Sequence, residues 1–212
     1  MINILLVDDH TIVRDGLKRI ISESTGMQVI AEAENGRIAL DTIYENSAIN
    51  FIVLDISMPG ESGLGVLKEI KNHDVELPVL MLSMHAQDQY AIRTLKAGAS
   101  GYLTKESASI LLVEAIQKIH EGGRFISDEV AELLALNLND NKFEFTHEQL
   151  SDREYQVMNM IASGKTIVEI SKELNLSDKT ISTYRARILE KMELKTNAEI
   201  THYAFSNDLV NK

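Results

Sequence analysis

Three carboxylates, a hydroxyl and an ammonium group stand where short apolar segments of this chain end. Asp8 and Asp9 follow INILLV, Asp55 closes FIVLD, Ser83 closes PVLMLS, and Lys105 follows GYLT. If these segments are neighbouring parallel strands, their carboxyl ends share one edge of a sheet, where ligands of such folds collect. Clustered carboxylates repel one another, and a hard divalent cation with oxygen ligands relieves that repulsion. The pattern therefore predicts a Mg²⁺ site.

The same residues predict phosphoryl chemistry at this edge. With a cation neutralising the acids, a carboxylate can attack phosphorus and form an aspartyl phosphate, while an ammonium and a hydroxyl bind the phosphoryl oxygens. Asp55 is the candidate nucleophile, and Lys105 and Ser83 are the candidate groups for the phosphoryl oxygens. His10 and His85 lie near the same edge, but nothing pairs them at metal-ligand spacing, so we expect neither to be a ligand.

The segments that carry these residues alternate between strand and helix patterns. Short apolar runs occupy residues 2–7, 28–33, 51–55, 78–83 and 101–105, and helical periodicity lies near residues 11–24, 36–46, 63–73, 87–97 and 108–121. Strands that alternate with helices indicate a parallel sheet covered by helices on both faces, with right-handed crossovers. We therefore expect an α/β domain of the (βα)5 type with a doubly wound parallel sheet.

The composition is that of a folded protein with more than one domain. The 212 residues are 44% hydrophobic and 25% charged, and a chain of this length is expected to form two domains of roughly 100 residues each. The absence of cysteine excludes disulfides and thiolate metal sites and fits a cytoplasmic protein. No apolar stretch reaches membrane-spanning length, and the opening run lacks a basic segment, so we interpret it as a strand rather than a signal peptide.

The motifs VDDH (residues 7–10), LDISMPG (54–60), LSMH (82–85) and GYLTK (101–105) resemble, in residue type and spacing, the receiver domain of bacterial two-component response regulators. The resemblance covers residues 1–121. It implies that a histidine kinase or a small phosphodonor phosphorylates Asp55. The Mg²⁺ ligands that it implies are Asp9, Asp55, the backbone carbonyl of Ser57 and, through water, Asp8.

The same resemblance implies a conformational switch. Ser83 would follow the new phosphoryl group inward, and Tyr102 would rotate into the space that is vacated. A new dianion biases such a bistable element by offering charge-assisted hydrogen bonds. The receiver is expected to phosphorylate itself stoichiometrically rather than to act as a turnover enzyme, because the LDIS stretch lacks a second carboxylate, two residues after Asp55, that would serve as a general acid.

A polar stretch, NLNDNKFEFTH, separates this region from a C-terminal third with helix signals alone. Ser151, Thr166 and Thr196 each stand three residues before a Glu, which is the pattern of a helix capping box. Ser177 marks a fourth helix start as a simple N-cap. The expected domains are a receiver over residues 1–121, a linker with a short helix in SDEVAELLALNL over 122–147, and a helix-turn-helix domain over 148–212.

Two of the expected C-terminal helices, at residues 167–174 and 178–192, are joined by a short turn. The second carries basic and hydroxyl side chains, although residues 146–212 as a whole hold nine Lys and Arg against ten Asp and Glu. Such a helix suits the DNA major groove, because cationic side chains hold phosphates and small polar groups reach base edges. The side chains expected to pack inward are Ile181, Ile188, Leu189 and Met192.

The segments LSDRE, GKTIVEISKELNLSDKTIS and KMELKTNAE resemble the LuxR-type helix-turn-helix of the NarL/FixJ response regulators over residues 148–208. By that resemblance the residues that face base edges are Ser182, Thr183 and Ala186. Those that hold phosphates are Lys179, Thr180, Arg185, Arg187 and Lys191. The final helix, near residues 197–206, resembles the family's dimer contact through Ala198, Thr201 and Ala204.

Together these expectations describe a phosphorylation-activated transcriptional regulator. A sensor histidine kinase is the expected phosphodonor and double-stranded promoter DNA the expected ligand. A homodimer is the expected phosphorylated form, and no membrane partner is expected. Two alternatives stay open: a receiver protein whose output domain binds protein or RNA, and a phosphatase that turns over a substrate through an aspartyl phosphate.

Overall fold

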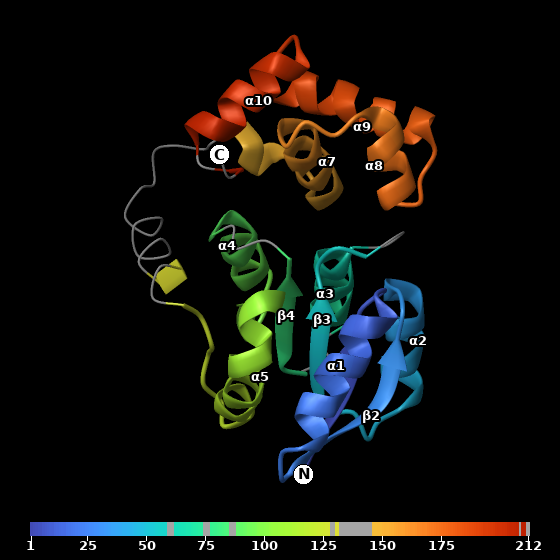
Figure 1. Cartoon of the computed structure of the whole chain (residues 1–212), viewed down its shortest axis with the longest axis vertical. Helices are drawn as coiled ribbons and strands as arrows, with labels where there is room; N and C mark the ends of the chain where they lie inside the picture. The colour runs from blue at the N-terminus through green and yellow to red at the C-terminus, as the bar shows by residue number, and fades with distance from the viewer. Residues whose placement is uncertain are drawn as a thin grey trace. The chain divides into compact units, whose positions relative to one another are not determined.

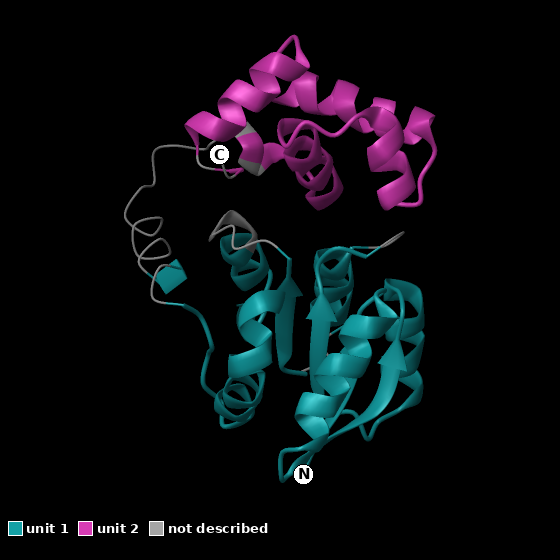
Figure 2. Cartoon of the chain, in the orientation of Figure 1, with its two compact units in different colours: residues 1–136 teal, residues 137–212 magenta. Residues whose placement is uncertain are grey.

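The chain, described here by a computed structural model, divides into two compact units: unit 1 (residues 1–136) and unit 2 (residues 137–212) (Figure 2). The residues that the structure describes are 1–58, 62–73, 77–84, 88–127, 130–131, 146–207 and 209–210. Most of the expected linker and of its short helix therefore lies outside the described residues, as does His85.

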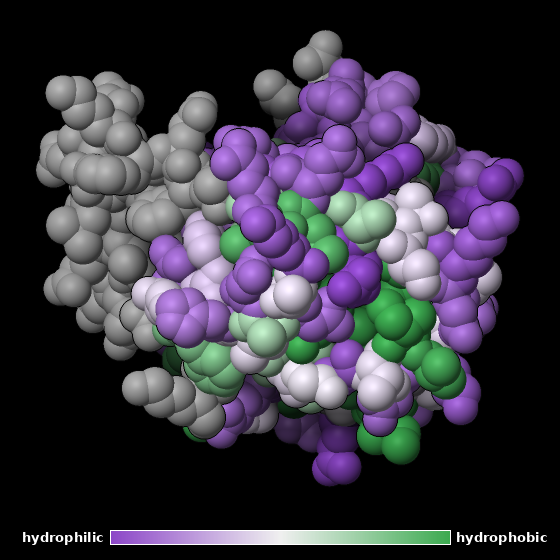
Figure 3. Space-filling model, turned by 90° about the horizontal axis from the view of Figure 1, so that it is seen from above, coloured by the Kyte–Doolittle hydropathy of each residue, from purple (hydrophilic) through white to green (hydrophobic). Residues whose placement is uncertain are grey.

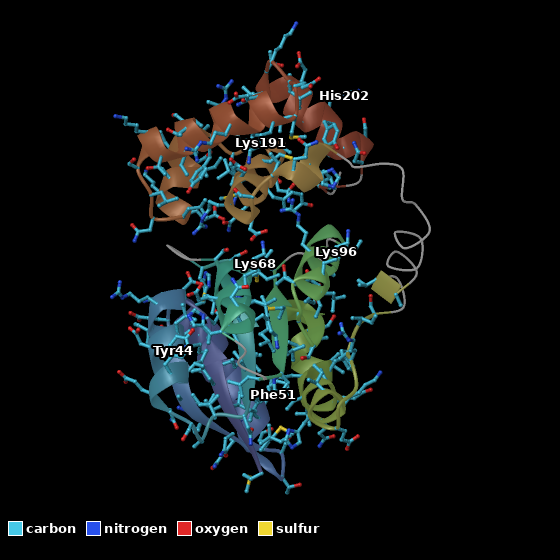
Figure 4. All side chains as sticks on the ribbon, turned by 180° about the vertical axis from the view of Figure 1, so that it is seen from behind. Tyr44, Phe51, Lys68, Lys96, Lys191 and His202 are labelled. Carbon is cyan, nitrogen blue, oxygen red and sulfur yellow. The ribbon has the colours of Figure 1, made fainter. Side chains whose placement is uncertain are left out.

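Unit 1 is built on a parallel sheet of five strands in the order β2-β1-β3-β4-β5. Figure 1 labels β2, β3 and β4 of this sheet. The strands are β1 (Ile2–Val7), β2 (Met27–Ala33), β3 (Phe51–Asp55), β4 (Val79–Ser83) and β5 (Gly101–Thr104). Every residue of β3 and β4 is buried, which explains why these two strands are continuous apolar runs. Phe51, at the start of β3, lies in the interior of unit 1 (Figure 4).

Helices cover both faces of this sheet. They are α1 (Thr11–Ser22), α2 (Gly36–Glu45), α3 (Gly63–Asn72), α4 (Asp88–Lys96) and α5 (Lys105–His120). α1 and α5 contact each other on one face, and α2 contacts α3 on the other (Figure 1). Leu17 of α1 and Leu112 of α5 join Ile4 and Leu6 of β1 in one buried cluster. The predicted α/β class, with helices on both faces of a parallel sheet, is confirmed.

The last helix of unit 1 begins earlier than the sequence pattern indicates. β5 ends at Thr104 and α5 begins at Lys105, whereas we expected strand through residue 105 and helix from residue 108. The reason is a helix cap: the Thr104 hydroxyl accepts a 3.1 Å hydrogen bond from the backbone N–H of Ser107. Lys105 is therefore the first residue of a helix that starts at the sheet edge.

The segment after α5 pairs with the edge strand β5. The N–H of Phe125 donates to the carbonyl of Ser100 at 3.2 Å, and the N–H of Tyr102 donates to the carbonyl of Phe125 at 2.9 Å. Gly101 permits this approach, because a Cβ there would lie 2.7 Å from Cδ1 of Ile119 and 2.8 Å from the Phe125 carbonyl oxygen. Backbone pairing within unit 1 thus extends past residue 121.

Unit 2 is helical in its described part. Its elements are a short 3-10 helix η1 (Thr146–Gln149) and the helices α7 (Asp152–Ala162), α8 (Ile167–Glu173), α9 (Asp178–Lys191) and α10 (Asn197–Ser206). α8 and α9 are the two helices expected on either side of a short turn. Asn175 in that turn has a φ of +51°, a left-handed conformation that Asn adopts more readily than most residues.

The helix starts of unit 2 follow the sequence signals, with one difference. Full capping boxes form at Ser151 with Glu154 and at Thr166 with Glu169. At Thr196 half of the box forms: its hydroxyl accepts from the N–H of Glu199 at 3.2 Å. The Glu199 carboxylate instead accepts from the N–H of Lys195 at 2.6 Å, one residue before the position that a capping box requires.

Candidate functional site

The carboxyl edge of the sheet gathers the acids and the ammonium that the sequence places at strand ends. Asp8 follows β1, Asp55 ends β3, and both side chains are fully buried. The Nζ of Lys105 lies 2.6 Å from Oδ2 of Asp8 and 2.9 Å from Oδ2 of Asp55, and its side chain is 7% exposed. Asp9 stands beside them with its side chain 22% exposed. The ammonium group of Lys105 is therefore shared by two buried carboxylates.

The electrostatics of this pocket favour a further cation. Burial raises the pKa of Asp55 to about 6; Lys105 opposes this rise and the neighbouring Asp8 adds to it. Burial alone would lower the pKa of Lys105, but the negative charges of Asp55 and Asp8 beside it outweigh burial and raise it. Lys105 thus stays charged, while the acids around it lack full compensation.

The donor set fits Mg²⁺. Asp8, Asp9 and Asp55 each present an oxygen, and these atoms lie within 4.8 Å of one another together with a ring nitrogen of His10. Oδ2 of Asp8, Oδ1 of Asp9 and both oxygens of Asp55 are buried without a well-directed hydrogen bond. Carboxylate oxygens left in this state suit a small, hard cation that keeps water among its ligands.

Sequence reasoning set His10 aside, and the structure brings it to the cluster. Its Nδ1 lies 2.9 Å from Oδ1 of Asp9 and 3.3 Å from Oδ1 of Asp8, with the side chain 61% exposed. A tight local turn causes this, since the His10 N–H donates to Oδ1 of Asp8 at 2.8 Å. The sequence signal for this contact was that His10 directly follows Asp8 and Asp9 in VDDH. It was missed because we compared the histidines with the usual spacing of metal ligands, which does not include immediate neighbours.

The remaining residues expected at this edge lie on or beside the same strands. Ser83 ends β4, is 1% exposed, and pairs in register with Thr104. Tyr102, in β5, is 6% exposed and donates its N–H to the segment that follows α5. Ser57, two residues after Asp55, is half-buried. Ser83 and Tyr102 therefore occupy the neighbouring strands β4 and β5.

A second candidate site is the exposed side of α9. Ile181 and Ile188 are fully buried and Met192 is nearly so, whereas Leu189, also expected inside, is half-buried. The face of the molecule drawn in Figure 3 is mostly hydrophilic, with smaller hydrophobic patches. The exposed residues among the expected DNA contacts are Lys179, Ser182, Thr183, Ala186, Arg187 and Lys191, and the half-buried ones are Thr180 and Arg185.

Two family descriptions match the chain along these same units. "Response regulator receiver domain" matches residues 4–117, and "Bacterial regulatory proteins, luxR family" matches residues 148–204. The chain belongs to the response regulators. The predicted family and the predicted order of a receiver followed by a helical luxR-type domain are confirmed.

This response regulator is similar along its whole length to proteins of known type. It is 38% identical over 212 residues to Response regulator UvrY of Escherichia coli (strain K12), covering 100% of the chain and 97% of UvrY. It is 33% identical over 211 residues to Response regulator GacA of Pseudomonas aeruginosa, covering 99% of the chain and 98% of GacA. Among solved structures it resembles RcsB of Salmonella enterica serovar Typhimurium bound to promoter P1flhDC in the presence of phosphomimetic BeF3⁻. That likeness has a TM-score of 0.65 and 25% identity, over 97% of this chain and 98% of RcsB.

The last helix of the response regulator corrects one expectation about dimer contacts. Ala204 is fully buried, because α10 turns it, four residues after the buried Ile200, toward the interior of unit 2. It therefore offers no surface to a second copy. Ala198 is exposed and Thr201 is half-buried. Phe205 was not among the residues that the sequence suggested for a dimer contact. It is 37% exposed and lies two helical turns after Ala198, on the same side of α10.

No helix in the part of the chain that the structure describes is long and apolar enough to cross a membrane.

Proposed function

We propose that this response regulator is a DNA-binding transcription regulator controlled by phosphorylation of Asp55. The observation that carries the proposal is the buried carboxylate at the end of β3 with the Lys105 ammonium 2.9 Å away. The RcsB relative was solved with promoter DNA and a phosphomimetic, which supports the same pairing of phosphorylation and DNA binding for this chain.

Asp55 acts as the nucleophile. Its carboxylate oxygen attacks the phosphorus of a phosphohistidine in a sensor kinase, or of a small phosphodonor, forming an acyl phosphate as the bond from phosphorus to the donor breaks. Lys105 holds a phosphoryl oxygen by a charge-assisted hydrogen bond. The transfer is stoichiometric, one phosphoryl group for each receiver, so the protein does not act as a turnover enzyme.

The residues that would hold Mg²⁺ are Asp9, Asp55, the backbone carbonyl of Ser57 and, through water, Asp8. A bound Mg²⁺ supplies positive charge to the acids and to the phosphoryl oxygens. Ser83 then donates its hydroxyl to the new phosphoryl group, and Tyr102 moves into the space that is vacated. The signal passes to the face formed by β4, β5 and their helices.

The exposed side of α9 enters the DNA major groove. Ser182, Thr183 and Ala186 face base edges, while Lys179 and Arg187 hold phosphates. Thr180 and Arg185 contact the backbone at the margins of this surface. Because unit 2 is close to neutral, its affinity depends on a locally positive helix and on dimerisation, which doubles the number of phosphate contacts.

The phosphorylated form is a homodimer that binds two half-sites of promoter DNA. The exposed side of α10, with Ala198, Thr201 and Phe205, supplies a contact between the two copies. Two-fold symmetry sets the half-sites about one helical turn of DNA apart, or a multiple of it. Promoter DNA and a kinase as partners place the protein's action in the cytoplasm.

Selection of duplex DNA from a random-sequence pool, with and without the phosphodonor acetyl phosphate, tests this function. We expect phosphodonor and Mg²⁺ to enrich a two-part sequence in the wild-type chain, and we expect no such enrichment with Asp55→Asn. A chain that selects RNA but no duplex would support an RNA-binding output instead. Repeated release of inorganic phosphate from a small phosphomonoester would support the phosphatase.

A further inference from the structure

Lys191, which Figure 4 labels, is the last residue of α9, and its side chain is bound to a residue of the first turn of α7. Its Nζ lies 2.6 Å from Oε2 of Glu154 and 3.4 Å from the backbone oxygen of Gln149. The Glu154 side chain is 3% exposed. The same Oε2 accepts a 2.8 Å hydrogen bond from the N–H of Ser151. One buried carboxylate oxygen therefore joins the cap of α7 to the end of α9.

This contact neutralises the charge of Lys191. A carboxylate as buried as that of Glu154 requires ionised or hydrogen-bonding partners. If the ammonium moved to a DNA phosphate, Glu154 would keep only the backbone N–H of Ser151 from this set of donors. Moving the Lys191 ammonium to a phosphate would therefore cost free energy, because the buried Glu154 carboxylate would lose its ion-pair partner. Lys191 is poorly placed to contribute a positive charge to DNA.

The other cations of α9 are in a different state. Lys179 and Arg187 are exposed and form no ion pair with another described residue. The Nε of Arg185 donates to Oδ1 of Asn197 at 2.6 Å, but Asn197 is neutral, so the guanidinium keeps its net charge. Lys191 is thus the one expected phosphate contact, among these described residues, whose charge is cancelled by a buried acid.

The ion pair also supplies directional information that apolar packing lacks. Ile181 and Ile188 bury the inner side of α9, but hydrophobic contacts have no preferred angle. A charge-assisted hydrogen bond has a narrow range of distance and angle. At the C-terminal end of α9, this hydrogen bond restrains the tilt of the helix, and a small change of tilt displaces Ser182 and Thr183 in the N-terminal half of the helix.

We propose that Glu154 and Lys191 are positioning residues for sequence-specific DNA recognition. Glu154 acts through Lys191 to set the placement of α9, and Lys191 does not bind phosphate. This assignment replaces the role that the family resemblance implied for Lys191. It rests on the proposed function of unit 2 as a DNA-binding domain.

Salt dependence separates positioning from phosphate contact. Each phosphate contact contributes about 0.9 to the slope of log affinity against log salt concentration. The full-length chain with Mg²⁺ and acetyl phosphate is titrated with two duplexes: one selected from the random pool by the wild-type chain, and one with the same bases in scrambled order. Lys191→Met keeps the aliphatic stem and removes the charge, Arg187→Ala is the matched phosphate-contact control, and circular dichroism checks folding.

We expect Lys191→Met to leave the salt slope unchanged, to lower affinity for the selected duplex about tenfold, and to leave affinity for the scrambled duplex unchanged. Arg187→Ala should lower both affinities alike and reduce the slope by about 1.8, because the dimer loses one phosphate contact in each of its two copies. Lys191→Arg should restore discrimination, because arginine also pairs with Glu154. A slope reduced by about 1.8 in Lys191→Met, with equal loss on both duplexes, would overturn the assignment.

Glu154→Gln is an independent test of the ion pair. The substitution removes the negative charge, but the amide oxygen can still accept the hydrogen bond from the Ser151 N–H. We expect the same loss of discrimination as in Lys191→Met; unchanged discrimination would contradict the positioning role even if Lys191→Met failed to fold. A wild-type chain that binds neither duplex would instead contradict the proposed function of unit 2, so the two failures are distinguishable.

Discussion

The Nζ of Lys105 is 2.9 Å from Oδ2 of Asp55, so the first residue of α5 is bound to the last residue of β3. The same ammonium is 2.6 Å from Oδ2 of Asp8. A single lysine cannot neutralise two buried carboxylates and the neighbouring Asp9, and because of this deficit we expect the acidic cluster to bind a cation. The charge deficit leads to measurable effects of pH and of Mg²⁺.

Stability of unit 1 should fall as pH rises through the pKa of Asp55. That pKa is raised to about 6 in the folded chain, so the folded state binds the proton more tightly than the unfolded state does. Proton binding to Asp55 therefore stabilises the folded state fully below the ordinary carboxyl pKa. This contribution to the free energy of unfolding, about 3 kcal/mol, is lost as pH rises through about 6. Thermal unfolding of the wild-type chain and of Asp55→Asn, without Mg²⁺, should differ more at pH 8 than at pH 4.

Mg²⁺ should stabilise the chain more at pH 8 than at pH 5. At the lower pH a proton on Asp55 competes with the cation, whereas at the higher pH the ionised carboxylate gains from it. Melting temperatures with and without Mg²⁺ at the two pH values measure the difference. An equal Mg²⁺ effect at both pH values, or the same effect in Asp55→Asn, would argue that the cation binds elsewhere.

Lys105→Met should impair signalling but keep Mg²⁺ binding. The substitution removes the ammonium that lies between Asp8 and Asp55 and is proposed to hold a phosphoryl oxygen, and it leaves the carboxylates that we expect to bind the cation. Calorimetric titration with Mg²⁺ and phosphodonor-dependent DNA binding measure the two properties separately. Lys18→Met is a suitable control, because Lys18 pairs with Glu32 at the surface and its side chain is 51% exposed. A normal DNA response in Lys105→Met would remove Lys105 from the mechanism.

Unit 2 should lose stability as the solution becomes acidic through the pKa of Glu154. Burial alone would raise that pKa, but the hydrogen bonds from Lys191 and Ser151 outweigh burial and lower it below its ordinary value. A depressed carboxyl pKa contributes stability above the unfolded value, and this contribution disappears as pH falls through the folded value. Urea unfolding at several acidic pH values should show a steeper loss in the wild type than in Glu154→Gln. Identical pH dependence in both would count against the buried pair.

Gly101→Ala should destabilise unit 1 by about 1–3 kcal/mol, because the new methyl group has no space between Ile119 and Phe125. Gly16→Ala is the matched control: it lies within α1, nothing stands within 4 Å of the added Cβ, and it should stabilise the helix by about 0.5–1 kcal/mol. Urea unfolding of both variants should show a lower free energy of unfolding for Gly101→Ala and a higher one for Gly16→Ala. A neutral Gly101→Ala would show that Phe125 can withdraw from β5 without cost.

The strands and the acidic site were predictable because their signals are local. The run FIVLD is apolar at every position except the last, as expected of a strand buried on both faces. Its one charged residue, Asp55, is therefore predicted to lie where the strand ends, at the edge of the sheet. Parallel strands end together, which places Asp8 and Asp55 near each other without knowledge of side-chain conformation. The capping boxes at Ser151 and Thr166 depend on residues three apart and also follow from the sequence.

The features that the sequence did not predict depend on long-range packing. The partner of Lys191, Glu154, lies 37 residues away, and nothing in either neighbourhood marks them as a pair. The burial of Ala204 depends on how α10 rolls against α7, and a small residue fits a dimer contact as well as a core. The early start of α5 was missed because the Thr104 cap was interpreted as part of the strand GYLTK.

Covalent phosphorylation by acetyl phosphate is the sharpest test of Asp55 as the phosphoacceptor. The purified full-length chain is incubated with acetyl phosphate, with and without Mg²⁺, and the modified peptide is located by mass spectrometry. We expect one phosphoryl group on the peptide that contains Asp55, dependent on Mg²⁺, absent in Asp55→Asn, and accompanied by tighter binding to the selected duplex. Phosphorylation of another residue, or equal DNA binding with and without modification of Asp55, would contradict it.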